Sequence, residues 1–152
     1  MEKTLKINVP SGYEICKEMS TSDNVIFKKI DDVIIKWNDV YKGVEIKEDG
    51  EHFVVHANKP SYCCSWDDAM RYCQKNGLDW KLPTVKQLQK LAKYIDKVNV
   101  IICDNNGFEI SGWMWSCEEK DEFHTWGVSM YNGHPDTTDK FAKLYMRTIY
   151  TL

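Results

Sequence analysis

The sequence predicts an α+β domain in which strands come first, two helices follow and strands return. Short extended runs separated by turn residues fill the first sixty residues or so, two helix starts follow, and apolar residues alternate again near the C-terminus. Strands and helices do not alternate as in a parallel, doubly wound sheet. We therefore expect a single domain over residues 1–152, with strands and loops in 1–58 and the core of the fold in 59–152.

The N-terminus is predicted to carry a short β-hairpin extension. Leu5, Ile7 and Val9 alternate with polar residues, and a second extended run begins at Val25–Phe27. A polar, loop-like stretch lies between these two runs. Two short strands joined by such a loop are typical of a small antiparallel hairpin.

A second hairpin is predicted further along the chain. The apolar runs Val44–Ile46 and Phe53–Val55 flank Glu48-Asp49-Gly50, and an Asp-Gly pair favours a tight hairpin turn. Just before it, we expect Trp37–Gly43 to form a short helical turn, with the Trp-Asn-Asp sequence at its start.

Two helices are predicted in the middle of the chain. The first covers Trp66–Asn76, and Ser65 before it can accept a hydrogen bond from the free amides of its first turn. The second begins at a capping box formed by Thr84 and Gln87, and its apolar stripe continues to Ile95. Because each helix has an apolar face and a polar face, the pair is expected to pack against a sheet.

The C-terminal third predicts a three-stranded antiparallel meander. Residues 112–116 form the first expected strand, and apolar residues alternate along the second, His124–Met130. Tyr131-Asn132-Gly133 opens a long turn, and Leu144–Tyr150 is expected to return as the third strand. The apolar run Val98–Ile102 before this meander does not by itself indicate a particular element.

Composition excludes several classes of partner. The net charge is −3 and the basic residues are dispersed, so no cationic stripe predicts a nucleic-acid partner. No segment approaches the roughly 18 apolar residues of a membrane-spanning helix. The opening residues lack the apolar centre of a signal peptide, so a cytoplasmic location is the default expectation, with a phage particle or a cell surface as alternatives.

The cysteines are expected to be mostly buried, reduced thiols. Without a leader peptide, the reduced state is the better expectation for the six of them. No Cys-x-x-Cys spacing is present, and adjacent Cys63 and Cys64 project in different directions from an extended chain, so zinc is not expected. We expect neither a metal nor a cofactor.

Several motifs together resemble a known family. Trp66, Ala69, Cys73 and Gly77 are followed by WKLPTVKQL, WMWSCEE, TWGVSMYNG and KLYMRTIY. In this order and spacing they resemble the bacterial C-type-lectin-like domains related to the Lcl C-terminal domain and, more distantly, formylglycine-generating enzymes. The resemblance covers about Trp66 to Tyr150.

The resemblance implies a C-type-lectin-like fold, with two helices packed on a twisted antiparallel sheet. Trp80, Trp115 and Trp126 would then belong to the core. The family's helix cysteine usually pairs with a cysteine on the last strand, where this chain has Thr148, so the resemblance leaves Cys73 without that partner. Formylglycine-generating relatives use two cysteines near the C-terminus for copper-dependent oxidation, and this chain has none after Cys117.

Chemical alternatives centre on the acidic loop after Trp115. Glu118–Glu122 offers oxygen ligands for calcium, but a solvated acidic turn is the commoner interpretation. Cys117 and His124 could form a thiolate and base pair across a hairpin, although no signature supports it. His52 and His56 fall on an expected strand, where their spacing separates the side chains by roughly 13 Å and prevents a shared metal.

We therefore expect a non-catalytic binding module rather than an enzyme. It would recognise a glycan or a protein surface through the segments 104–113, 117–124 and 131–139, with phage or bacterial surface attachment as the expected setting. The alternatives are a cysteine- or metal-dependent enzyme and a structural subunit of a larger particle. The candidate binding residues are Trp113, Glu118, Glu119, Asp121, His124, Tyr131, Asn132, His134 and Asp136.

Overall fold

The computed structural model describes residues 13–15, 27–29, 32–59, 62–75, 77 and 79–152. The chain divides into two compact units, Met1–Val33 and Ile34–Leu152. In the first unit, β1 (Tyr13–Ile15) pairs antiparallel with β2 (Phe27–Lys29). This confirms the N-terminal hairpin, whereas the run at residues 5–9, expected as its first strand, lies outside the described residues.

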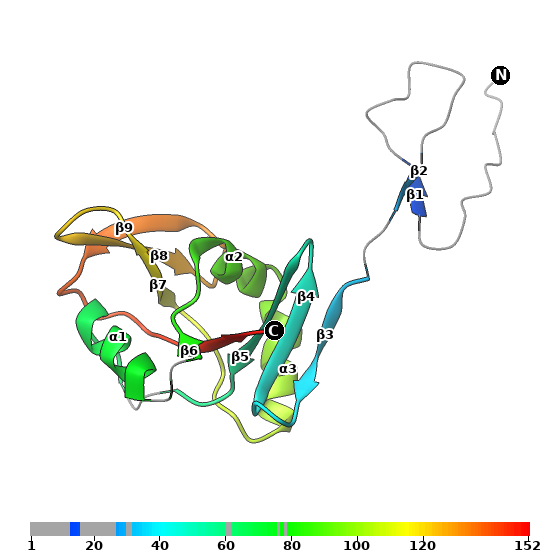
Figure 1. Ribbon diagram of the computed structural model, residues 1–152, viewed down its shortest axis with the longest axis horizontal. Helices are drawn as coiled ribbons and strands as arrows, with labels where there is room; N and C mark the ends of the chain where they lie inside the picture. Colours follow the sequence, from blue (N-terminus) through cyan, green and yellow to red (C-terminus); the bar gives the residue numbers. More distant parts are fainter. Residues whose placement is uncertain (1–12, 16–26, 30–31, 60–61, 76, 78) are drawn as a thin grey trace, which may run out of the picture. The chain divides into compact units, whose positions relative to one another are not determined.

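The described part of the second unit contains two antiparallel sheets and three helices (Figure 1). The α+β class is therefore confirmed. The five-stranded sheet has the order β3-β4-β5-β10-β6, and the three-stranded sheet has the order β7-β8-β9. The elements are β3 (Ile34–Asn38), β4 (Gly43–Glu48), β5 (Glu51–His56), α1 (Trp66–Lys75), β6 (Trp80–Lys81), α2 (Val85–Lys93), α3 (Ile95–Asp104), β7 (Trp113–Glu119), β8 (His124–Ser129), β9 (Pro135–Asp139) and β10 (Ile149–Thr151).

Two apolar clusters stabilise this unit. The larger one joins the inner face of the five-stranded sheet to α2, α3 and the buried side chains Met114 and Val128 of the other sheet. The smaller one packs α1 against Trp115, which is fully buried and donates its indole N–H to the Cys64 carbonyl at 2.8 Å. The three-stranded sheet thus has a cluster on each side.

The local signals for α1 and α2 are confirmed. Ser65 Oγ accepts the Asp68 amide N–H at 3.4 Å, and α1 covers Trp66–Lys75, while the expected last residue, Asn76, lies outside the described residues. Thr84 and Gln87 form the predicted capping box: Thr84 Oγ1 accepts from the Gln87 amide at 3.1 Å, and Gln87 Oε1 accepts from the Thr84 amide at 2.9 Å. These side chains satisfy amides that the first turn of a helix leaves free.

A third helix, α3, corrects the expectation of two. The helical path is interrupted at Tyr94, which ends α2 and precedes α3 without providing a side-chain cap. Val98 and Ile102, from the apolar run that indicated no particular element, are buried in the larger cluster on one face of α3. None of the described helices is long and apolar enough to cross a membrane.

Two further expectations are wrong. Residues 34–38 are a strand, and Asn38 at its end accepts hydrogen bonds from the Val40 and Tyr41 amides at 3.0 Å, which makes a turn into β4 rather than a helix start. Within residues 144–150, only Ile149 and Tyr150 belong to a strand, and β10 joins the five-stranded sheet. The third strand of the meander is β9, inside the segment expected to be a long turn.

The tryptophans divide between the core and the surface. Trp115 is buried as predicted. Trp80 and Trp126 are only half-buried, which corrects their placement in the core. Trp80 packs edge-on against Tyr41 and Tyr150, with ring centroids 6.3 and 5.7 Å away, on the side of β5 and β10 facing away from the larger cluster.

Candidate functional site

The three-stranded sheet places Trp113, Gly127 and Asp136 on one face. Trp113 lies opposite Ser129, and Trp115 lies opposite Gly127. Across the next strand pair, Gly127 lies opposite Asp136. Directly opposite residues on neighbouring strands project to the same face, as do residues two apart on one strand. This face therefore carries an indole at one end and a carboxylate on the outer strand.

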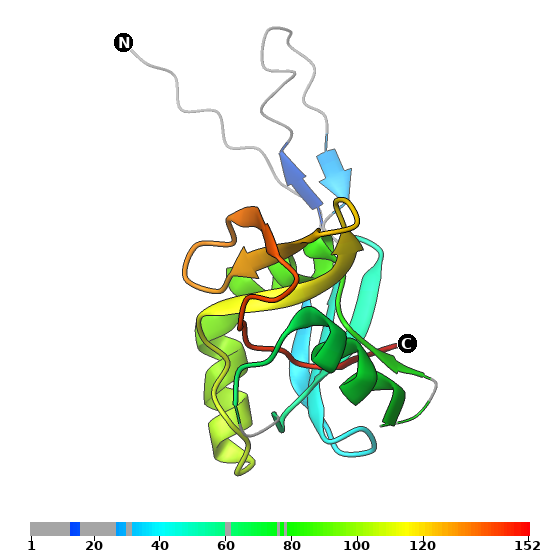
Figure 2. The ribbon, with the colours of Figure 1, turned by 90° about the vertical axis from the view of Figure 1, so that its left-hand side faces the viewer.

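The segment after β9 covers part of this face. It runs beside β7 on its way to β10 (Figures 1 and 2), and the Tyr145 amide donates to the Trp113 carbonyl at 3.0 Å while the Trp115 amide donates to the Tyr145 carbonyl at 3.0 Å. Leu144 then lies over Gly127, because a Cβ atom added to Gly127 would meet Leu144 Cδ1 at 3.1 Å. The glycine allows this close approach.

A groove of about 270 Å³ remains between these elements. Trp113 is 38% exposed, and the position of a Cβ on Gly127 is 3.9 Å from Trp113 Cε3. The indole therefore lies beside Gly127, and the missing side chain at this position leaves room for Leu144 next to it. We call this the Trp113 groove; it is lined by Trp113, Gly127, Asp136, Thr137, Thr138 and Leu144.

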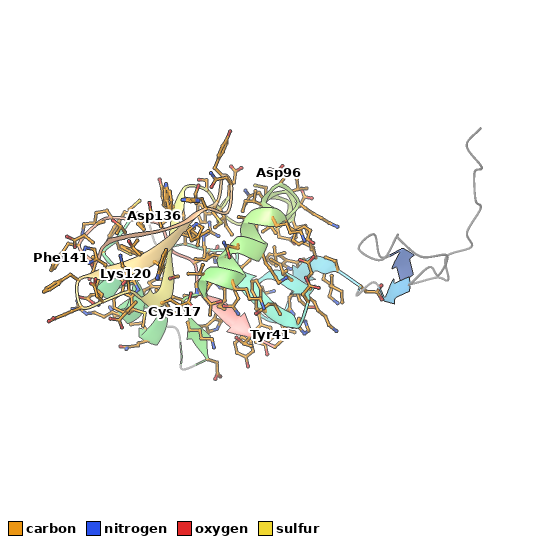
Figure 3. All side chains as sticks on the ribbon, turned by 90° about the horizontal axis from the view of Figure 1, so that it is seen from above. Tyr41, Asp96, Cys117, Lys120, Asp136 and Phe141 are labelled. Atoms are coloured by element: carbon orange, nitrogen blue, oxygen red, sulfur yellow. The ribbon has the colours of Figure 1, made fainter. Side chains whose placement is uncertain are left out.

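Asp136, Thr138 and Thr125 supply the polar groups on this face. Asp136 Oδ1 accepts the Thr137 amide N–H at 2.8 Å, and no hydrogen bond among the described residues uses Oδ2. Thr138 lies opposite Thr125. The Thr125 hydroxyl is buried and has no hydrogen-bond partner in the described part of the chain. Figure 3 shows Asp136 in the same part of the molecule as Lys120 and Phe141, away from Tyr41.

A larger cavity of about 630 Å³ lies near Tyr131. Its lining includes charges of both signs, among them Asp96 and Lys97 from the first turn of α3 and Glu109 from the following loop. Tyr131 itself is 94% exposed, so its ring is not held in one place by packing. The Trp113 groove offers a better-positioned aromatic ring and is the stronger candidate site.

The glutamates of the acidic loop form contacts within the protein. Glu118 Oε2 accepts the Val85 amide N–H at 2.9 Å and so caps α2, where a negative charge is favourable. Glu119 Oε2 lies 2.6 Å from Lys140 Nζ. Both also line an open groove of about 520 Å³ with Trp126 and Pro135. These residues do not line the Trp113 groove.

Asp121 organises the turn between β7 and β8. Its Oδ1 accepts the amides of Phe123 and His124, each at 2.9 Å, and lies 2.8 Å from His124 Nδ1. The hydrogen bond from the His124 side chain is the main reason that the pKa of Asp121 is below its usual value. Within the described ranges, no group of three or more His, Cys, Asp or Glu side chains could hold a metal ion.

The turn after β8 places the remaining candidates. Asn132 Oδ1 accepts the His134 amide N–H at 2.9 Å, and the His134 carbonyl accepts the Ser129 amide at 3.0 Å. Both side chains are exposed and neither lines the Trp113 groove. Of the nine residues predicted from the sequence, the groove brings together two, Trp113 and Asp136.

Cys117 and His124 do not form a catalytic pair in this structure. No hydrogen bond or ion pair of the described residues joins them, and the His124 ring is directed to Asp121. Burial raises the pKa of the Cys117 thiol, with a further contribution from Glu118, which disfavours the reactive thiolate. Cys73 is a free, buried thiol.

Four lining residues, Gly127, Thr137, Thr138 and Leu144, were not among the residues predicted from the sequence. Gly127 interrupts an otherwise apolar alternation in β8, and a glycine inside a strand pattern indicates close backbone approach, so this signal was present. Thr137 and Thr138 lie in the predicted binding segment 131–139, which was interpreted as a long turn and not as the strand β9, and Leu144 was assigned to a strand. The groove depends on the path of the chain after β9, which no local pattern shows.

Comparison with known proteins identifies the family. The model of the Lcl C-terminal domain matches residues 36–150, which is most of the chain and nearly all of the second unit. A search of curated proteins finds no match. The matched range includes the three-stranded sheet, nearly all of the five-stranded sheet, all three described helices and the Trp113 groove. The chain therefore belongs to the Lcl C-terminal domain family.

Proposed function

We propose that this chain is a non-catalytic binding module with a C-type-lectin-like fold, which recognises a glycan through the Trp113 groove. One observation carries the proposal: a partly exposed indole and a carboxylate line the same groove, on either side of Gly127, which has no side chain. Attachment to a bacterial or phage surface is the setting that we propose for this recognition.

The chemistry of the groove suits a sugar ring. One face of a pyranose presents C–H groups, which pack against an aromatic ring, while its hydroxyl groups need hydrogen-bond partners. Trp113 supplies the ring, and Asp136 and Thr138 supply oxygen atoms nearby. Because Trp113 belongs to a strand, little conformational freedom of its backbone is lost on binding.

The size of the groove favours a glycan over a protein surface. A stable protein interface buries roughly 800 Å² on each partner, which requires a broad complementary surface. The Trp113 groove instead has a volume of about 270 Å³ and six lining residues, the scale of a pocket for a small ligand. The internal contacts of Asp121 and His124, together with the raised pKa of Cys117, weigh against the enzyme alternative.

A glycan array tests the proposal. The wild-type protein is compared with Trp113→Ala and with Phe141→Ala, which removes an aromatic side chain that is 78% exposed and does not line the groove. We expect wild type and Phe141→Ala to bind the same glycans. We expect Trp113→Ala to lose about tenfold or more in affinity, since an aromatic contact contributes on the order of 1 kcal/mol beyond the area it buries.

Two results would contradict the proposal. One is the absence of glycan binding by the folded wild-type protein; the other is glycan binding that Trp113→Ala leaves unchanged. Circular dichroism of each variant shows whether the fold is intact. If the protein instead elutes from size exclusion as a large defined oligomer and binds no glycan, the structural-subunit alternative is favoured.

A further inference from the structure

We infer that the Trp113 groove selects uncharged pyranose rings and disfavours sugars that carry a carboxylate or sulfate group. This inference rests on the proposed function and specifies its ligand class. It starts from the charge of the groove: Asp136 is the one charged side chain among the described residues that line it. A ligand in the groove therefore meets a negative charge without a cation beside it.

The nearby lysine does not compensate for this charge. Lys140 Nζ lies 2.6 Å from Glu119 Oε2 and 4.8 Å from the centroid of the Trp66 ring, and only 14% of its side chain is exposed. Its ammonium group already has a carboxylate partner and an aromatic partner. Lys143 precedes Leu144 in the chain but does not line the groove. Neither lysine is among the residues that line the groove.

The polar groups present match hydroxyl groups instead. A carboxylate only accepts hydrogen bonds, and Oδ2 of Asp136 has no donor among the described residues. A sugar hydroxyl can donate to it, whereas an ionised carboxylate or sulfate cannot and would be repelled. Thr138 can both donate and accept, so it can complete the hydrogen bonding of a neighbouring hydroxyl.

The experiment compares uncharged and acidic monosaccharides. The indole N–H signals of ¹⁵N-labelled protein are followed by NMR at pH 7 during titration with methyl glucoside, methyl mannoside and methyl galactoside, and then with glucuronic acid and glucose 6-sulfate. The Trp113 signal is assigned from its loss in Trp113→Phe. We expect at least one uncharged glycoside to shift this signal, with an affinity at least about tenfold higher than either acidic sugar.

Asp136→Asn tests the source of the selectivity. Asparagine keeps the size of the side chain but removes the charge, so we expect the preference for uncharged sugars over acidic ones to fall by about tenfold. Asp139→Asn is the matched control, because Asp139 lies on the same strand, is exposed, and does not line the groove. This control is expected to keep the wild-type preference.

The outcomes separate the inference from the proposed function. Trp113-dependent binding that favours acidic sugars, or a preference that Asp136→Asn leaves unchanged, overturns the inference while the glycan-binding function stands. If neither the array nor the titrations show any sugar bound at Trp113, the proposed function fails and the inference fails with it. A preference for uncharged over acidic sugars that Asp136→Asn weakens and Asp139→Asn preserves supports both the inference and the proposed function.

Discussion

Lys93 Nζ lies 2.8 Å from Glu48 Oε1, an ion pair that connects the end of α2 to the turn between β4 and β5. The Tyr94 hydroxyl donates to the same oxygen at 2.7 Å, and Lys90 Nζ lies 3.4 Å from Oε2. The side chain of Glu48 is 9% exposed, so these contacts replace most of its hydration. Glu48 thus connects the five-stranded sheet to α2, the helix that packs against the three-stranded sheet.

The first prediction concerns Glu48→Gln. The hydrogen bond from Lys93 is the main cause that lowers the pKa of Glu48 to about 2 from its ordinary value of 4.5. Since the folded-state pKa is depressed, the stabilisation is complete above pH 4.5 and is lost as the pH falls toward 2. We expect Glu48→Gln to lower the free energy of unfolding by about 2 kcal/mol at pH 7.

Urea denaturation at several pH values checks this prediction. The difference between wild type and Glu48→Gln should narrow as the pH falls from 4.5 toward 2. Glu51→Gln is the control, because among the described residues the Glu51 carboxylate pairs with one cation, the exposed Lys86, at 3.6 Å. The loss of this surface ion pair should change stability by less than about 1 kcal/mol. If the two variants lowered the free energy of unfolding equally at pH 7, the buried contacts of Glu48 would contribute no more than an exposed ion pair, which contradicts the prediction.

The second prediction concerns Arg147, which is 2% exposed and has no carboxylate partner among the described residues. Its guanidinium donates to four backbone carbonyls, those of His56 and Ala57 at 3.2 and 3.0 Å, Glu109 at 3.1 Å, and Phe108. Burial lowers the pKa of Arg147 to about 10. These bonds join the end of β5 to the loop that leads into β7.

Arg147→Lys should therefore be strongly destabilising although the charge is kept. One ammonium group cannot reach four carbonyls arranged for a planar guanidinium, so some buried carbonyls lose their donors. We expect a loss of about 3 kcal/mol in the free energy of unfolding, measured by urea denaturation. Arg71→Lys changes an exposed arginine on α1 and should have almost no effect. A loss below about 1 kcal/mol for Arg147→Lys contradicts this prediction.

The sequence could predict elements whose signals are local. Thr84 and Gln87 identified the start of α2, and Asp49-Gly50 identified a hairpin turn in which both residues have positive φ, 49° and 81°. The start of α3 lacked such a signal, because Tyr94 provides no side-chain cap. The strand β9 was missed because Pro135–Asp139 is polar and extended only through its pairing with β8.

The candidate site was predictable only in part for a related reason. Trp113 and Asp136 stood out as an aromatic and a charged residue in segments expected to be exposed. Their proximity depends on the register that places Gly127 opposite both Trp115 and Asp136, and on Leu144 crossing the same face. These are relationships between distant segments, and residue patterns along a single strand do not contain them.

The third prediction concerns the thiols of the smaller cluster. Burial is the main cause that raises the pKa of Cys64 to about 11 and that of Cys73 to about 12. Cys103 is exposed at the end of α3. Because alkylation requires the thiolate and access to it, iodoacetamide at pH 8 should modify Cys73 more than about a hundredfold more slowly than Cys103.

Mass spectrometry of peptides from a labelling time course measures these rates. In denaturant the two cysteines should react at similar rates, which shows that the protection comes from the fold. A high rate for Cys117 in the folded protein would revive the enzyme alternative, since it would reveal an accessible thiolate despite the raised pKa. Similar native rates for Cys73 and Cys103 would contradict the packing of α1.

The fourth prediction concerns Asn99, which holds the loop that leads to Trp113. Asn99 Oδ1 accepts the Ile110 amide N–H at 2.8 Å, and its Nδ2 donates to the Ile110 carbonyl at 2.9 Å. In Asn99→Asp, an oxygen replaces the donor and faces the carbonyl, so the ionised form is repelled. We expect a loss of about 2 kcal/mol at pH 7.

This loss should decrease in acid. The carbonyl disfavours the carboxylate, which raises the folded-state pKa of the introduced side chain above the ordinary aspartate value of about 4. Its protonated form can donate to the Ile110 carbonyl again, so stability relative to wild type should recover as the pH falls. Asn105→Asp is the control, because Asn105 is exposed while donating to the Ile101 carbonyl at 2.9 Å. Urea denaturation at pH 7 and pH 4 measures the recovery, and a pH-independent loss would mean that the introduced carboxylate does not face that carbonyl.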